Sequence, residues 1–136
     1  MQKNNLNIYF RNPWKRIGPF IDHSRDMKIA RDKASKIMYD QYRSLGYRKP
    51  IDYLISVDFV FYVLRRWEPD LDNLPAFVLD AMMGVKVKGA GGLKVGAILV
   101  DDKLVRQESS RKIVEGDVNY DGEPRTEIRI SRYRSR

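Results

Sequence analysis

An alternating apolar run between residues 53 and 63 limits the fold more than any other feature of the chain. Apolar side chains occupy every second position, at Tyr53, Ile55, Val57, Phe59, Phe61 and Val63. Successive side chains of a β-strand point to opposite faces of its sheet, so this spacing predicts a strand with one wholly apolar face. The intervening residues are mixed and predict a half-buried second face: Leu54, Ser56, Asp58, Val60 and Tyr62.

Two helices are predicted around this strand. The first has Asp26 as its N-cap and stops at Gly46. Its apolar residues recur at helical spacing, at Met27, Ala30, Ala34, Ile37, Met38, Tyr42 and Leu45. The second has Asp72 as its N-cap, accepts Pro75 in its first turn and ends at Gly84. Its buried face is predicted to be Leu74, Phe77, Val78, Ala81 and Met82.

Further short strands are predicted at residues 7–11, 97–100, 105–115 and 126–133, the last two joined by a turn at Asp121-Gly122. Residues 85–96 combine lysines with several glycines and predict a flexible basic loop. The expected fold class is α+β, a small mixed β-sheet with two main helices packed on it. A length of 136 residues fits a single domain over residues 1–136.

The composition favours a polyanionic partner. Lysine and arginine outnumber aspartate and glutamate by 26 to 18, giving a net charge of +8. Nucleic acid is the commonest reason for such an excess, although an inert basic surface would share it. The absence of cysteine excludes disulfides and thiolate zinc sites, and it fits a reducing cytoplasm. The longest apolar run, Phe59 to Leu64, is too short to span a bilayer, so we expect a cytoplasmic protein without a membrane partner.

Aspartates gather at two points of this basic chain. Asp70 and Asp72 follow the alternating strand, and Asp101-Asp102 comes later. Carboxylate oxygens suit Mg²⁺, with Mn²⁺ as a possible substitute, and a metal held against a phosphodiester activates water for its hydrolysis. Taken singly, Asp72 fits a helix cap, Asp80 a solvated helix residue and Asp101-Asp102 a turn. Together on a basic chain they also fit a nuclease.

The order of these motifs resembles that of the RusA-like Holliday junction resolvases, small endonucleases of bacteria and phages. The matching residues are Asp70-Leu71-Asp72-Asn73-Leu74, then Asp80-Ala81, Asp101-Asp102 and Gly122-Glu123-Pro124-Arg125. The resemblance implies a homodimer that cleaves four-way DNA junctions by paired nicks with magnesium, in recombination or repair. It implies that Asp70, Asp72 and Asp102 are the catalytic metal ligands, with Asp101 assisting. It further implies that Asn73 and Asp80 do not bind the metal themselves but support the side chains that do.

Basic residues near these motifs are predicted to contact DNA phosphates: Arg65, Arg66, Lys86, Lys88, Lys94 and Lys103. The family carries a catalytic lysine where this chain has Ala76, and the basic loop is longer than in the family. One hypothesis is that Lys86, Lys88, Lys94 or Lys103 replaces that lysine. The alternative is a weakened or inactive member that still binds DNA. A basic RNA-binding domain is a third reading, although the aromatic-rich strand of common RNA modules is absent from the sequence.

Overall fold

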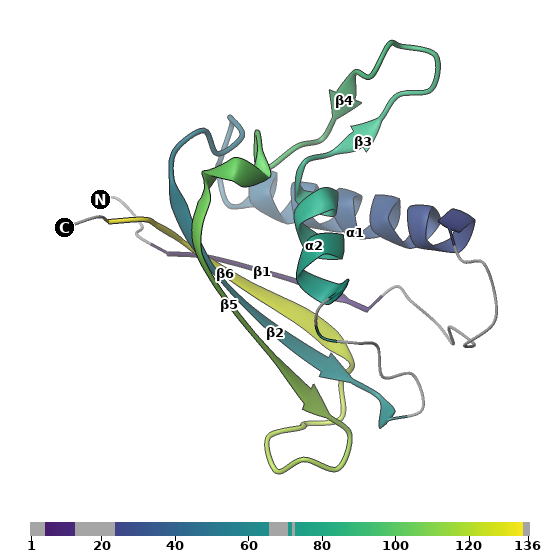
Figure 1. The fold of residues 1–136 in the computed structure, drawn as a ribbon, viewed down its shortest axis with the longest axis vertical. Helices are drawn as coiled ribbons and strands as arrows, with labels where there is room; N and C mark the ends of the chain where they lie inside the picture. The colour runs from purple at the N-terminus through teal and green to yellow at the C-terminus, as the bar shows by residue number, and fades with distance from the viewer. Residues whose placement is uncertain (1–4, 13–23, 66–70, 72, 135–136) are drawn as a thin grey trace.

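The computed structural model describes residues 5–12, 24–65, 71 and 73–134 (Figure 1). For residues 24–26 it describes the backbone only. It confirms a mixed α+β fold. The elements in chain order are β1 (Asn5–Arg11), α1 (Ser24–Ser44), β2 (Ile55–Val63), α2 (Asn73–Met82), β3 (Val85–Lys86), β4 (Lys94–Val95), the short 3-10 helix η2 (Asp102–Leu104), β5 (Val105–Val114) and β6 (Arg125–Arg132).

The main sheet has the strand order β1-β6-β2-β5. β6 pairs antiparallel with both β1 and β2, whereas β2 and β5 run parallel. The sequence placed the last two strands to within a residue at each end. It also placed a glycine turn at Asp121-Gly122, and Gly122 does adopt a positive φ. The strands that this connection joins do not pair with each other, because β2 lies between them.

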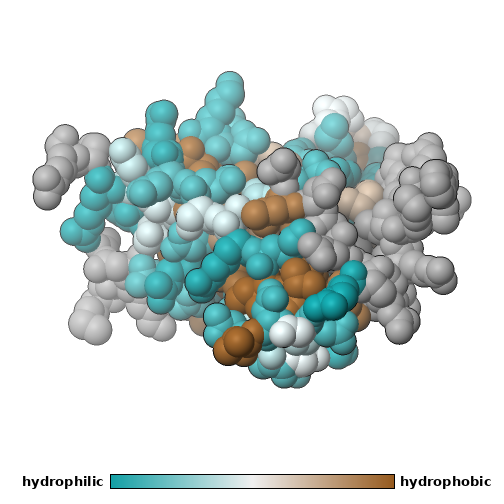
Figure 2. Space-filling view, turned by 60° about the horizontal axis from the view of Figure 1, so that its bottom comes forward, coloured by the Kyte–Doolittle hydropathy of each residue, from teal (hydrophilic) through white to brown (hydrophobic). Residues whose placement is uncertain are grey.

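The sheet has one apolar face and one polar face. All five odd-numbered residues of β2, from Ile55 to Val63, are buried as predicted, and both helices lie on their side of the sheet. Tyr53, predicted to start the same face, precedes the strand and is half-buried. On the other face, Asp58 stands opposite Arg129 of β6 and accepts a hydrogen bond from the Ser109 hydroxyl of β5. The molecular face drawn in Figure 2 is largely hydrophilic, with hydrophobic residues in small separate groups.

The helices differ from expectation mainly at their edges. α1 begins at Ser24, so Asp26 lies inside the helix and is not its N-cap as predicted. Ala30, Ala34, Met38 and Tyr42 form the buried stripe of α1, whereas Ile37 and Leu45, expected in the core, are 39% and 48% exposed. In α2 every predicted core residue is buried. Gly46 ends α1 as predicted, with the Gly46 amide bonded to the Arg43 carbonyl and the Tyr47 amide to the Tyr42 carbonyl.

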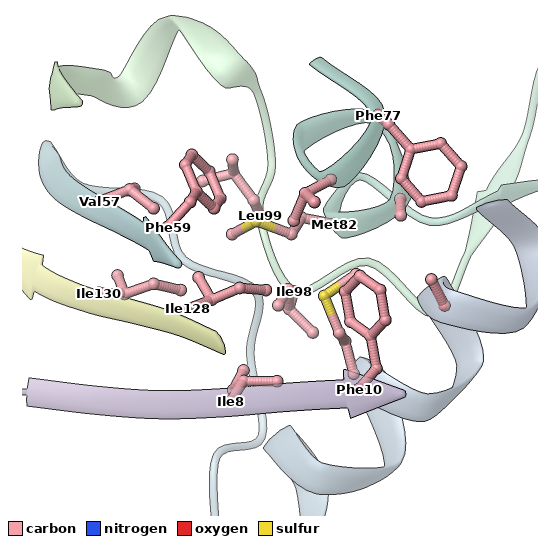
Figure 3. Packing of buried hydrophobic residues seen from close by; sticks show 14 of the residues in the cluster. Ile8, Phe10, Val57, Phe59, Phe77, Met82, Ile98, Leu99, Ile128 and Ile130 are labelled. Carbon is pink, nitrogen blue, oxygen red and sulfur yellow. The ribbon is translucent and has the colours of Figure 1, made fainter. Parts of the chain in front are cut away.

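The predicted strand at residues 97–100 is wrong. Leu99 makes only an isolated parallel bridge with Ile51, and the segment is otherwise irregular. Its apolar residues are needed in the core rather than in a sheet. Ile98 and Leu99 are fully buried, and Figure 3 shows Leu99 meeting Met82 and Phe59 while Ile98 lies between Ile128 and Phe10. The segment therefore fills part of the core between the helices and the sheet.

The basic segment at residues 85–96, predicted to be a loop, contains a short hairpin. Val85–Lys86 and Lys94–Val95 pair antiparallel as the hairpin β3–β4. The Val87 amide extends the pairing with a 2.8 Å hydrogen bond to the Leu93 carbonyl. Three of the glycines lie at the tip, where Gly89, Gly91 and Gly92 have positive φ, and Gly96 follows β4 with a positive φ of its own.

No helix in the described part of the chain is long and apolar enough to cross a bilayer.

Candidate functional site

Part of the predicted acidic site falls outside the described residues. Asp70, Asp72 and Arg66 all lie there. Their described neighbours are Leu71, which is half-buried against the core, and Asn73, which is exposed and begins α2. The Leu74 amide donates to the Leu71 carbonyl at 3.2 Å, which ties Leu71 to the first turn of α2.

Arg65, predicted to bind DNA, makes its described contacts within the protein. Its backbone amide donates to the Glu115 carboxylate at 3.3 Å, and its guanidinium donates to the Glu115 carbonyl at 3.3 Å. A side chain at Gly116 would meet the same guanidinium at 2.8 Å. Arg65 therefore joins the end of β2 to the start of the β5–β6 connection.

Asp101 and Asp102 are adjacent and exposed, but their described roles differ. Asp101 caps η2, and its carboxylate accepts a 2.9 Å hydrogen bond from the Lys103 amide. That hydrogen bond is the main reason why the pKa of Asp101 lies below its ordinary value, with help from Asp102 and the Lys103 charge. Asp101 is therefore ionised at neutral pH. Asp102 occupies the first turn of η2 with its side chain exposed to solvent.

The segment leading to this pair is anchored at the C-terminal end of α2. The amides of Ile98 and Leu99 both donate to the Met82 carbonyl, at 2.8 and 3.0 Å. Val100 then bonds to the Ile51 carbonyl at 3.0 Å. In Figure 1, η2 is the short green turn that precedes β5, and it lies nearer to the C-terminal end of α2 than to its N-terminal end.

Among the residues that the structure describes, no three acidic or histidine side chains lie close enough together to hold a metal ion. Asp101 and Asp102 thus supply two carboxylates of a type that Mg²⁺ accepts, but they do not complete a site by themselves.

Two further predicted positions lie on α2. Ala76 is exposed, so a side chain at this position reaches solvent. Asp80 is also exposed, and its described partner is Arg31 of α1, with an oxygen–nitrogen distance of 3.8 Å. Asp80 therefore takes part in a contact between the two helices.

The structure brings two of the predicted lysines together with residues of α1. Lys86 and Lys94 face each other across the hairpin β3–β4 and line a hollow of about 220 Å³. We call it the basic hollow; its lining residues are Lys28, Arg31, Asp32, Asp80, Gly84, Lys86 and Lys94. Lys88 lies apart, exposed at the hairpin tip, and Lys103 lies within η2.

Lys28 and Arg31 belong to the charged side of α1, and their sequence spacing alone does not indicate that they meet the hairpin. Their spacing puts them on one side of α1, and Lys28 also pairs with Asp32 at 3.0 Å. Only the hairpin's position shows which part of that long face meets other basic residues.

No protein-family model matches this chain, and no curated protein matches it in sequence.

Proposed function

We propose that this protein is a magnesium-dependent endonuclease that nicks four-way DNA junctions, acting as a cytoplasmic homodimer. The observation that carries the proposal is the ordered acidic series on a basic chain: Asp70 and Asp72 before α2, and the exposed pair Asp101-Asp102 before β5. The mixed α+β fold and the basic hollow are consistent with it.

The proposed chemistry divides the work between carboxylates and cations. The resemblance assigns Asp70, Asp72 and Asp102 to one metal, with Asp101 beside Asp102, and this assignment requires the start of α2 and the η2 segment to come together around the ion. A bound magnesium ion polarises a phosphodiester and lowers the pKa of a coordinated water. The lysines would hold phosphates of the same DNA, which concentrates the substrate at the protein.

The first test uses a labelled synthetic four-way junction. Wild-type protein with Mg²⁺ is expected to give paired nicks that disappear with chelator. Asp72→Asn and Asp102→Asn should each lower the cleavage rate by about 100-fold or more, because each removes charge at the metal. Asp40→Asn is the matched control, since Asp40 is an exposed α1 residue paired with Lys36. Cleavage that persists in chelator, or that survives both substitutions, would refute the proposal.

A specific observation favours a second candidate, a junction-binding protein without cleavage. Ala76 is exposed on α2 where the resembling family has its lysine, and a methyl group cannot stabilise phosphate charge. Under this alternative, wild-type protein binds the junction tightly and makes no nicks. The substitution Ala76→Lys would then be expected to produce nicking.

Competition with single-stranded RNA separates both readings from an RNA-binding domain. Equal or tighter binding to RNA than to the junction would favour the RNA-binding domain.

A further inference from the structure

The basic hollow carries an excess of positive charge that the fold itself does not neutralise. Four cationic side chains line it against two carboxylates. Both carboxylates have partners on α1: Asp32 pairs with Lys28 at 3.0 Å and Asp80 with Arg31 at 3.8 Å. Within the described part of the chain, Lys86 and Lys94 have no ion-pair partner.

The placement of Lys86 and Lys94 opposes folding stability. They are direct partners in the antiparallel register of β3 and β4, so their side chains project from the same face of the hairpin. Like charges placed directly opposite each other destabilise a strand pair. An anion seated between them would remove this repulsion.

The hairpin is fixed so that these lysines face α1. Gly84 leads from α2 into β3 with φ of +93°, and a Cβ there would lie 2.6 Å from the Val95 carbonyl oxygen. The chain after β4 returns to α2 through the bonds of Ile98 and Leu99 to Met82. Because both ends of the hairpin are tied to the end of α2, the two lysines are held against Lys28 and Arg31 before any ligand arrives.

We infer that the basic hollow binds a backbone phosphate of the DNA, with Lys28, Arg31, Lys86 and Lys94 as its cationic contacts. A volume of about 220 Å³ is below the ~300–1,000 Å³ typical of pockets for drug-sized ligands and suits a single small group. Arginine and lysine are the side chains that most often contact phosphate oxygens. The identity of the ligand as DNA rests on the proposed function, but the hollow requires no metal and none of the proposed catalytic carboxylates.

The test measures junction binding in chelator, where cleavage cannot interfere, over a range of salt concentrations. Lys86→Gln/Lys94→Gln is compared with Lys36→Gln/Lys49→Gln, which removes the same charge from exposed positions outside the hollow. We expect the first pair to weaken binding about 100-fold, or roughly tenfold for each lost charge-assisted contact. The slope of log K against log salt should become shallower by up to about 1, since the hollow holds one phosphate and each phosphate contact contributes ~0.9. A Lys28→Gln variant should weaken binding about tenfold.

The outcomes separate this inference from the proposed function. If the hollow variants bind like the control pair, the inference is overturned, whether or not the wild type cleaves junctions. If they bind weakly while the wild type never cleaves with Mg²⁺, the inference stands and the nuclease proposal fails. A wild type that does not bind DNA overturns both, whereas an effect of the lysine pair on RNA binding alone overturns the inference and leaves the nuclease proposal to the cleavage assay. Circular dichroism of each variant confirms that the fold is retained.

Discussion

At the scale of single residues, Arg125 shows how a basic side chain can serve the fold rather than a ligand. Its guanidinium donates to the Asp121 carboxylate at 2.7 Å and to the Glu127 carboxylate at 2.8 Å. It also lies 3.9 Å from the centre of the Tyr62 ring on β2. With 16% of its side chain exposed, Arg125 fastens the β5–β6 connection to the sheet.

Replacing Arg125 with methionine should therefore lower the free energy of unfolding by about 1–2 kcal/mol, because a cation–π contact and charge-assisted hydrogen bonds are lost together. Chemical denaturation measures this change. Arg129→Met on the same strand is the matched control, since Arg129 is exposed, and its effect should stay within about 0.5 kcal/mol. Equal effects of the two substitutions would contradict the role given to Arg125.

The same substitution should change how stability depends on pH. The Arg125 hydrogen bond, followed by that of the Glu123 amide, holds the pKa of Asp121 below its ordinary value of 3.8. Because the folded pKa is the lower one, Asp121 stabilises the fold above that ordinary value, and this contribution is lost as pH falls through the lowered pKa. In Arg125→Met this acid-dependent loss should be smaller, which thermal unfolding across acidic pH would measure.

At the scale of elements, the hairpin β3–β4 depends on one glycine at its base. Gly84 combines a positive φ with a close approach to the Val95 carbonyl, so an added methyl group meets backbone rather than a flexible side chain. Gly122 has nearly the same φ, +97°, but nothing lies within 4 Å of its Cβ position. The two glycines therefore allow the cost of the contact to be measured apart from the cost of the conformation.

Gly84→Ala should destabilise the protein by about 2–4 kcal/mol, and Gly122→Ala by only about 1–2 kcal/mol, the usual cost of a left-handed backbone for a residue with a Cβ. Denaturant titration of both variants gives the comparison. If both substitutions cost the same, the hairpin is not tightly seated on α2. In that case Lys86 and Lys94 would also lose their fixed position beside α1.

At the scale of the whole molecule, a single core joins both helices to the sheet. Residues of α1, α2, β1, β2, β6 and the segment around Leu99 belong to one buried cluster. None of the described elements forms a separate core. The hairpin β3–β4, which contributes no residue to the cluster, is largely exposed and is held in place through α2. This arrangement favours all-or-none unfolding.

We expect one cooperative unfolding transition in urea. The loss of helical circular dichroism and the loss of aromatic near-ultraviolet circular dichroism should coincide, since the Tyr42 and Phe59 environments form with the helices. Transitions at separate urea concentrations would show that the helices and the sheet unfold as independent units.

The sequence by itself determined the elements whose periodicity is set by local geometry. The alternation of β2 and the helical spacing in α2 predicted their buried residues, because side-chain direction in a regular element follows from backbone geometry alone. Composition likewise determined the basic charge. The same logic failed at residues 97–100, where four apolar residues fit either a strand or a core-filling segment.

Only the tertiary structure decided which elements meet. In the sheet, β2 lies between β5 and β6, and no local sequence pattern predicts this strand order. Gly84 at one end of the hairpin, and the hydrogen bonds of Ile98 and Leu99 after its other end, fix the hairpin to the C-terminal end of α2. This position places Lys86 and Lys94 beside Lys28 and Arg31. Residues that are far apart in the chain form one charged hollow because packing of the core fixes their distances, whereas sequence spacing fixes only neighbours within an element.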